Sequence, residues 1–416
     1  MGDVVSALAD VCAAVRPGGR ADAVGGKTPA VVASPATIAE ASSLMRVASS
    51  HRLAVVPRGS GTKLGHGAPP VRCELIVDMS RFGHVIEHAA GDLVVRVQAG
   101  LLMADLAARL APAGQQLALD LNGTVGGVIA TGAAGPRRLR YGAPRDLLIG
   151  ITVVLADGTV ASAGGKVVKN VAGYDLGKLF AGSHGTLGLI AEAAFRLHPL
   201  PQASAYLTLS CATAQNAADR VRAAVESQLR PSAAEIDQPA PRAPLSVGVL
   251  LEGAAEALPE RVTRMRDILG PGSQASATPP AWWGASVTGT DGVSLRVAFP
   301  PGALANVLDA VGAGGAGLEP AVRGSAGVGV VEVGLAPGIS PEAAGRFVTA
   351  VRRRLSPPPA WGEVPGASVT VLSAPAPVYE AVPAFGPVPA LELMRAVKDR
   401  FDPGHLMSPG RFAGGI

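Results

Sequence analysis

A glycine-rich loop with several hydrogen-bond donors follows the apolar pair Val55 and Val56. In order, the residues after that pair are Pro57, Arg58, Gly59, Ser60, Gly61, Thr62 and Lys63. Glycines let successive backbone amides point at one place, and the hydroxyls and the lysine add donors and positive charge, so the loop can bind an anion. Its spacing fits neither a dinucleotide-binding Gly-x-Gly-x-x-Gly turn nor a Gly-x-x-x-x-Gly-Lys-Thr phosphate loop. Taken alone, it is explained equally well as an ordinary glycine-rich surface loop.

Two further segments combine glycine with polar and charged residues. The candidate residues of the second segment are Gly123, Thr124, Val125, Gly126, Gly127, Gly132, Arg138 and Tyr141. Those of the third are Lys169, Asn170, Gly173, Tyr174, Asp175, Gly182, Ser183, Gly185, Thr186, Leu187, Gly188 and Ile190. Dense glycine lets a flat ligand approach the main chain, and a nearby guanidinium can neutralise phosphate, although any single arginine can equally be a solvated surface charge. A bound cofactor explains the third segment better than packing alone.

Composition excludes several other classes of protein. Charged residues make up 16% of the chain and the net charge is +4, which gives no indication of nucleic-acid binding. Cys12, Cys73 and Cys211 are far apart, so they cannot build an iron–sulfur cluster or a cysteine zinc site. No apolar run reaches the ~18 residues of a membrane span, and Asp3 stands where a signal peptide would be basic. We therefore expect a cytoplasmic protein.

Hydrophobic periodicity predicts a mixture of helices and strands in both halves of the chain. In the first half, helices are expected at 3–16, 37–51 and 102–110, and strands at 53–56, 75–77, 85–87, 93–98 and 187–197. An Asp157-Gly158 turn predicts a hairpin of 149–155 with 160–163. After Pro199 to Pro201, strands at 204–211, 245–252, 293–299, 327–335 and 367–373 alternate with helices at 214–228, 259–269, 301–312 and 340–355. A last helix is expected at 391–401.

In this order, the three glycine-rich segments resemble the FAD domain of the vanillyl-alcohol oxidase and p-cresol methylhydroxylase (PCMH) superfamily. The similarity is greater to the FAD-binding subunits of bacterial glycolate oxidases, through 57–62, 123–127, 169–175 and 182–188. It covers residues 28–200 well, returns at 402–411 and is weak over 203–385.

The resemblance implies an α+β fold in which a two-lobed PCMH-type FAD-binding domain is joined to an α+β cap domain. The expected divisions are a leader at 1–27, the FAD domain at 28–201 with lobes at about 28–110 and 115–201, the cap at 202–385, and a C-terminal segment at 386–416 that packs on the FAD domain. The first loop would hold the pyrophosphate of FAD through amides. Thr124 to Gly127 with Gly132 would line the ribityl chain and flavin, and 182–188 with Ile190 would surround the adenosine side.

The resemblance also bears on how FAD is held and on what the cap contributes. Members that attach flavin covalently use a histidine in the first loop, where this chain has Thr62, so noncovalent FAD is expected although His66 is near. The caps of relatives that oxidise 2-hydroxy acids usually supply histidines for a metal. All seven histidines here (His51, His66, His84, His88, His184, His198 and His405) lie outside 199–404. No metal site is therefore predicted, and the catalytic residues stay unassigned.

These points predict an FAD-binding subunit that supports oxidation of glycolate or another small 2-hydroxy acid within a complex. Its partners would be a catalytic flavoprotein subunit and an iron–sulfur subunit, and any membrane association would be peripheral and made through them. No nucleic-acid partner is expected. Two alternatives stay open: a stand-alone FAD-dependent oxidoreductase, and a flavin-binding scaffold without redox work.

Overall fold

A computed structural model describes residues 2–165, 175–289, 291–315, 317–355 and 366–416. The chain forms two compact units. The first comprises Met1–Ala134, Ala143–Leu200 and Pro387–Ile416, and the second comprises Gly135–Gly142 and Pro201–Gly386.

The first unit begins with a four-stranded sheet whose strand order is β1-β2-β4-β3. The strands are β1 (Val15–Pro17), β2 (Val31–Ala33), β4 (Leu75–Asp78) and β3 (Val55–Arg58). β2 and β3 each pair with β4 in parallel, and α2 (Ile38–Ser50) makes the crossover from β2 to β3 that parallel strands of one sheet require. Thr37 caps this helix by accepting a hydrogen bond from the Glu40 amide. α1 (Gly2–Val11) packs on α2, and the core between helices and sheet is largely aliphatic, with Phe82 also buried in it.

A second, antiparallel sheet of the same unit has the order β5-β6-β10-β8-β9. Its strands are β5 (Val85–Ala89), β6 (Val94–Gln98), β10 (Leu189–Arg196), β8 (Leu148–Val154) and β9 (Val160–Gly164). The predicted β8–β9 hairpin is confirmed, with Gly158 at a φ of 84° and Asp157 accepting from the Thr159 amide at 2.8 Å. The other elements are α3 (Met103–Leu110), α4 (Val125–Thr131), α6 (Pro144–Leu147), α7 (Gly177–Phe180), and the short pair β7 (Gln115–Gln116) and β11 (His198–Pro199).

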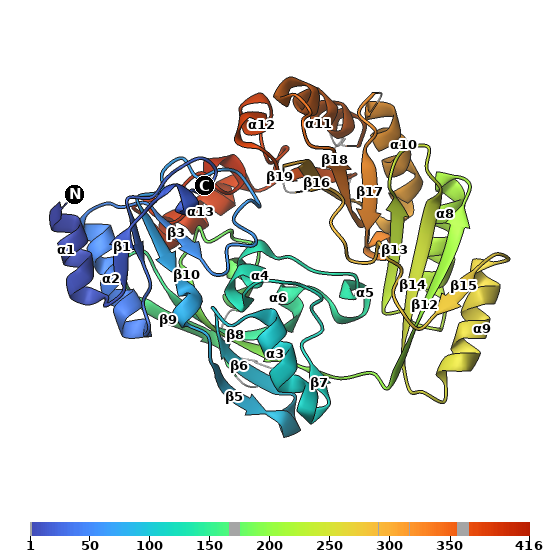
Figure 1. Ribbon diagram of the computed structural model, residues 1–416, viewed down its shortest axis with the longest axis horizontal. Helices are drawn as coiled ribbons and strands as arrows, with labels where there is room; N and C mark the ends of the chain where they lie inside the picture. The colour runs from blue at the N-terminus through green and yellow to red at the C-terminus, as the bar shows by residue number, and fades with distance from the viewer. Residues whose placement is uncertain (1, 166–174, 290, 316, 356–365) are drawn as a thin grey trace. The chain divides into compact units, whose positions relative to one another are not determined.

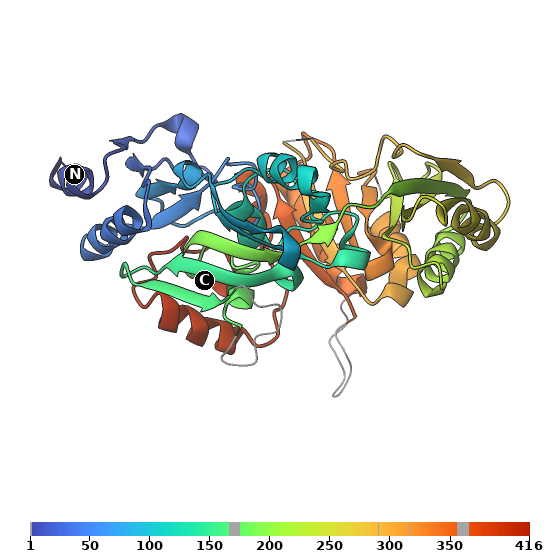
Figure 2. The ribbon, with the colours of Figure 1, turned by 90° about the horizontal axis from the view of Figure 1, so that it is seen from below.

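The C-terminal segment returns to this unit through α13 (Leu391–Phe401), the helix predicted at the same residues. Figure 1 shows this red segment beside the blue strand β3, where the Ser408 backbone amide donates to the Val55 carbonyl at 2.8 Å. In the turned view of Figure 2 the red helix lies against the green strands, and Val397 and Phe401 pack on the core of the five-stranded sheet. The tail is therefore a structural part of the N-terminal unit.

One buried ion pair fixes the end of α13. The Lys398 ammonium donates to Asp402 Oδ2 at 2.7 Å, to the Thr186 carbonyl at 2.7 Å and to the Met407 carbonyl at 2.9 Å. Asp402 also accepts from two backbone amides of the tail, and both side chains are at most 1% exposed. Burial lowers the pKa of Lys398, and the Asp402 carboxylate opposes that shift.

A four-charge network spans the first sheet. Arg58 on β3 bonds Asp22 at 2.8 Å and Asp78 at 2.7 Å, and Asp22 also pairs with Arg16. The guanidinium of Arg16, and after it that of Arg58, holds the pKa of Asp22 well below its usual range. Burial acts to raise the pKa of Asp78, but hydrogen bonds from Ser80 and Arg58 outweigh it, so that pKa is also lowered. Two cations and two anions thus compensate one another.

The second unit is built on an eight-stranded antiparallel sheet of order β15-β12-β14-β13-β17-β18-β16-β19. These strands are β15 (Gln274–Ser276), β12 (Ala203–Cys211), β14 (Leu245–Gly253), β13 (Ala233–Gln238), β17 (Ala321–Gly324), β18 (Val330–Leu335), β16 (Val293–Ala298) and β19 (Ser368–Ser373). Its helices are α5 (Arg138–Tyr141), α8 (Ala214–Glu226), α9 (Leu258–Leu269), α10 (Leu304–Gly314), α11 (Pro341–Leu355) and α12 (Ala376–Ala381). The predicted strand at 327–335 starts only at Val330, because 326–328 form a 3-10 turn ended by Gly329 at a φ of 70°.

Within the described ranges, no helix is long and apolar enough to span a bilayer.

Replacing the buried cation in Lys398→Met should lower the free energy of unfolding by about 3–5 kcal/mol, because the Asp402 carboxylate would stay buried without its partner. Chemical denaturation measures this, with Arg400→Met, an exposed site on the same helix, as the control. The double variant Lys398→Met/Asp402→Asn should be less destabilised than Lys398→Met. Equal losses in the single and double variants would contradict a coupled pair.

Asp22→Asn should lower the thermal midpoint at pH 7 by roughly 3 °C, since it weakens three charge-assisted hydrogen bonds, two from Arg16 and one from Arg58. The folded-state pKa values of Asp22 and Asp78 are lowered, so their stabilisation is present above pH ~4 and is lost as the pH falls below that value. The difference between wild type and Asp22→Asn should accordingly shrink between pH 4 and pH 2. Thermal melts across this range check it, with the exposed Asp10→Asn as control. A constant difference at every pH would count against the ion pairs.

Candidate functional site

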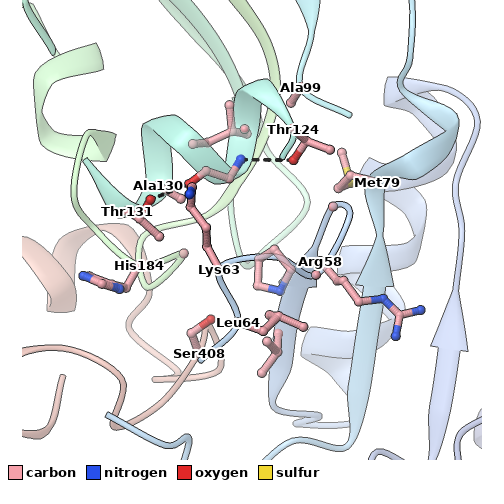
Figure 3. A pocket seen from close by; sticks show the side chains of 18 of the residues that line it. Arg58, Lys63, Leu64, Met79, Ala99, Thr124, Ala130, Thr131, His184 and Ser408 are labelled. Carbon is pink, nitrogen blue, oxygen red and sulfur yellow. Dashed lines mark hydrogen bonds between the residues drawn. The ribbon is translucent and has the colours of Figure 1, made fainter. Parts of the chain in front are cut away.

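A pocket in the first unit draws on four separate stretches of the chain. It is lined by the loop after β3, by α4 from its N-cap to its last turn, by the segment that leads into β10, and by the C-terminal tail. Figure 3 shows Lys63, Thr131, His184 and Ser408 around it, with Met79 and Ala99 on the side of the two sheets. Its volume is about 90 Å³, which is room for one portion of a dinucleotide and not for a whole one.

The loop after β3 presents unused backbone donors at this pocket. Turns close it, since the Leu64 amide donates to the Gly61 carbonyl and the His66 amide to the Lys63 carbonyl, both at 3.1 Å. The amides of Ser60, Gly61 and Thr62 donate to no acceptor within the part of the chain that the structure describes. Gly61 has a φ of 81°. Consecutive free amides at a positive-φ turn form a concave anion-binding surface.

Gly59 is required for the close approach of this loop to α4. A side-chain carbon there would overlap Oγ1 of Thr124, and that oxygen is already the N-cap of α4, accepting from the Gly127 amide at 3.3 Å. By contrast, a side-chain carbon at Gly65 would meet nothing within 4 Å. A side chain is therefore tolerated at Gly65 but not at Gly59.

The Arg58 side chain does not contribute its charge to the pocket. Its guanidinium is taken up by Asp22 and Asp78, and Figure 3 shows it directed away from Lys63, Thr124 and His184. The main chain of Arg58 lines the pocket while its side chain anchors β3 to β4. Lys63 is the lysine that lines the pocket among the described residues.

α4 connects the second and third segments. At its start, the Gly126 amide donates to the Ala99 carbonyl at 2.7 Å. At its end, the Ile129 carbonyl accepts from the Gly182 amide at 2.9 Å, and the Ala130 carbonyl accepts from the His184 amide at 2.7 Å. His184, at a φ of 54°, and Gly185 consequently reach the pocket.

The tail closes the pocket and leaves one buried hydroxyl without a partner. Arg411 donates to the carbonyls of Leu64 and His66, each at 2.7 Å, and so fixes the first loop from behind. Ser408 is 0% exposed and lines the pocket, and its Oγ makes no hydrogen bond to the described residues. A buried hydroxyl usually has a partner, so this one indicates a ligand atom.

The structure brings thirteen of the predicted residues together in the lining. They are Pro57, Arg58, Gly59, Ser60, Gly61, Thr62, Lys63, Thr124, Gly126, Gly127, Gly185, Gly188 and Ile190. Others lie behind it: Gly123 contacts Thr62, Val125 and Leu187 are buried in the core, and Gly132 ends α4 beside Gly182. The Ser183 hydroxyl donates to the Phe180 carbonyl, and the Thr186 hydroxyl donates to the Ser183 carbonyl. Asp175 forms an exposed pair with Lys178. Lys169, Asn170, Gly173 and Tyr174 lie outside the described residues.

Arg138 and Tyr141 are placed elsewhere, in α5 of the second unit. The Tyr141 hydroxyl donates to the buried carboxylate of Glu252 at 3.1 Å, and the guanidinium groups of Arg137 and Arg140 each lie over its ring, 5.7 Å and 5.4 Å from the ring centroid. Burial, with the nearby Glu252 charge, raises the pKa of Tyr141. These contacts give the tyrosine a structural role within the second unit.

Several lining residues were missed from the sequence. They are Val56, Leu64, Met79, Ala99, Ala130, Thr131, His184, Ser408 and Arg411. The apolar members look like ordinary core residues in a sequence. Ser408 and Arg411 belong to the tail segment that carried a resemblance, which was the one available signal for them.

Residues 29–164 match the model of a family described as an FAD binding domain. The glycolate oxidase subunit GlcD of Bacillus subtilis (strain 168) is 36% identical over 216 residues, which are 51% of this chain and 46% of that protein. The mitochondrial D-lactate dehydrogenase (cytochrome) 1 of Saccharomyces cerevisiae is 35% identical over 195 residues, 46% of this chain and 33% of that protein. The chain thus spans less than half the length of these curated relatives.

A solved structure of a chitooligosaccharide oxidase shares the fold. It superposes with a TM-score of 0.69 over 97% of both chains at 16% identity. The predicted α+β, PCMH-type fold class is therefore confirmed, and so is the resemblance to FAD-binding subunits of glycolate oxidase type. The free amides of the first loop and the unpartnered Ser408 hydroxyl are a donor set suited to a phosphate-bearing cofactor. Residues 29–164, in the first unit, are thus similar to an FAD-binding domain, and FAD is the cofactor of this chain.

Proposed function

We propose that this chain holds FAD noncovalently in the pocket of its first unit and serves as the FAD-binding subunit of a 2-hydroxy-acid dehydrogenase of the glycolate oxidase type. The observation that carries this proposal is the meeting of free loop amides, the start of α4 and the Ser408 hydroxyl in one pocket of an FAD-binding domain. When bound, FAD supplies a two-electron acceptor for oxidation of a hydroxyl to a carbonyl.

The residues of this chain bind and orient that cofactor. The amides of Ser60, Gly61 and Thr62 hold the diphosphate, whose size suits the small pocket better than the whole dinucleotide does. Lys63 adds a positive charge at the same place. Ser408 donates or accepts one further hydrogen bond. Arg411 fixes the position of the loop by donating hydrogen bonds to its carbonyls.

The first loop supports noncovalent binding. Its position for covalent attachment is Thr62, which carries no ring nitrogen. His66 follows four residues later, does not line the pocket, and has its carbonyl bonded to Arg411. Acid precipitation should therefore release the flavin into solution.

The names of the relatives suggest the substrate class. Glycolate and D-lactate are both small 2-hydroxy acids, and the relatives that match this chain carry those names. Residues 199–404 contain no histidine, so we place the proton-accepting group for the hydroxyl on a partner, the catalytic flavoprotein subunit. An iron–sulfur subunit would take the electrons onward, since the three cysteines here are buried and separate.

Gly59→Ala should raise the dissociation constant for FAD at least tenfold, because the added methyl group displaces Thr124 and with it the start of α4. Gly65→Ala, in the same loop with open space around it, should bind FAD like wild type. Quenching of flavin fluorescence measures the affinity, and circular dichroism of the apoprotein shows that each variant folds. Equal affinities for the two folded variants would place the cofactor elsewhere.

The isolated chain should contain flavin yet reduce an electron-accepting dye with glycolate at under ~1% of the rate of the complex co-purified from its native cell. D-lactate and a 2-hydroxy acid with a longer side chain test the breadth of substrate. A full rate from the isolated chain would show a stand-alone oxidoreductase. Absence of flavin from the folded chain would show a scaffold without redox work.

A further inference from the structure

A second pocket lies wholly within the second unit and is unusually rich in arginine. It is an open concavity of about 620 Å³ between the end of β14, the loop after α8, α5 and the start of α9. Arg140, Arg230 and Arg261 line it, together with Gln228 and Glu252. This volume is in the range of small-molecule sites.

Two of these guanidinium groups converge on a single carbonyl oxygen. Arg261 donates to the Glu252 carbonyl at 2.8 Å and to the Leu229 carbonyl at 2.7 Å. Arg140 donates to the same Glu252 carbonyl at 3.2 Å and to the Ser232 hydroxyl at 3.4 Å. Burial, with the repulsion of Arg140, lowers the pKa of Arg261. Neutral acceptors therefore hold two like charges close together.

The acid that lines this pocket, Glu252, is paired with other groups. The Glu252 carboxylate, 4% exposed, is taken up by Arg137 at 3.3 Å and by the Tyr141 hydroxyl at 3.1 Å. None of the three lining arginines forms a salt bridge with the residues that the structure describes. Arg230 is exposed and lies at a φ of 47°, a left-handed conformation that a non-glycine residue rarely adopts.

We propose that this pocket binds a small oxyanion with at least two negative charges, of the phosphate or dicarboxylate type. Planar guanidinium groups pair with such oxyanions through two parallel hydrogen bonds, and an anion between them removes their mutual repulsion. Arg140 and Arg230 make the contacts that the ligand adds, because Arg261 already donates from both of its terminal nitrogens, whereas both bonds of Arg140 come from Nη1 alone. The site is separate from the FAD pocket and does not depend on the proposed reaction.

The test uses the full chain loaded with FAD, so that its cofactor pocket is filled. Inorganic phosphate and malonate are titrated separately, with sodium chloride holding the ionic strength constant, and the thermal midpoint is recorded. A saturable rise of the thermal midpoint by about 2 °C is expected for at least one of the two anions. The anion that causes the rise shows whether the site prefers a phosphate or a dicarboxylate. Flavin absorbance of the same samples reports on the proposed function independently.

Arg140→Gln/Arg230→Gln should weaken anion binding at least tenfold. Arg222→Gln removes an exposed arginine of α8 that pairs with Asp219 and lies outside the pocket, so it should bind the anion like wild type. A midpoint that follows ionic strength alone would overturn the proposal. An equal shift in the double variant would do the same.

Discussion

One buried ammonium group, that of Lys398, determines how the pocket is closed. Its three donors go to Thr186 in the segment before β10, to Asp402 at the end of α13 and to Met407 in the tail. These partners are far apart in the sequence, and the ion pair is almost completely buried. Because a buried ammonium must keep all its acceptors, it fixes Thr186 and Met407 relative to each other, and these residues are neighbours of Gly185 and Ser408 in the pocket.

In the first unit, the Arg58 guanidinium stabilises the sheet, and backbone amides of the loop that follows bind the ligand. The Arg58 guanidinium is neutralised by two carboxylates and stabilises the sheet, whereas its main chain continues into the loop of free amides. Neutral amides can bind a diphosphate without the cost of burying an uncompensated cation when the ligand leaves. The loop is held at Gly59 by contact with Thr124 and at Leu64 and His66 by Arg411, so it is organised before the cofactor binds.

Local sequence signals were sufficient for much of this structure. The Asp157-Gly158 turn fixed a hairpin, and apolar spacing with the Asp402-Pro403 stop gave α13 its observed bounds. α4 was not predicted, because two glycines in its first turn give it a low helix propensity. The helix depends instead on the Thr124 cap and on contacts with Ala99. β13 was not predicted, because Glu235 and Asp237 interrupt its apolar pattern. In the folded sheet, Asp237 is paired with Arg323. In the same way, Met79, Ala99 and Ser408 reach the pocket only through tertiary packing.

Amide hydrogen exchange of the folded chain, with and without FAD, measures the central claim directly. If the loop amides hold the cofactor, exchange at Ser60, Gly61 and Thr62 slows strongly on FAD binding, while exchange at the exposed Gly65 changes little. Saturation with FAD that leaves these three amides exchanging at their original rates would contradict the account.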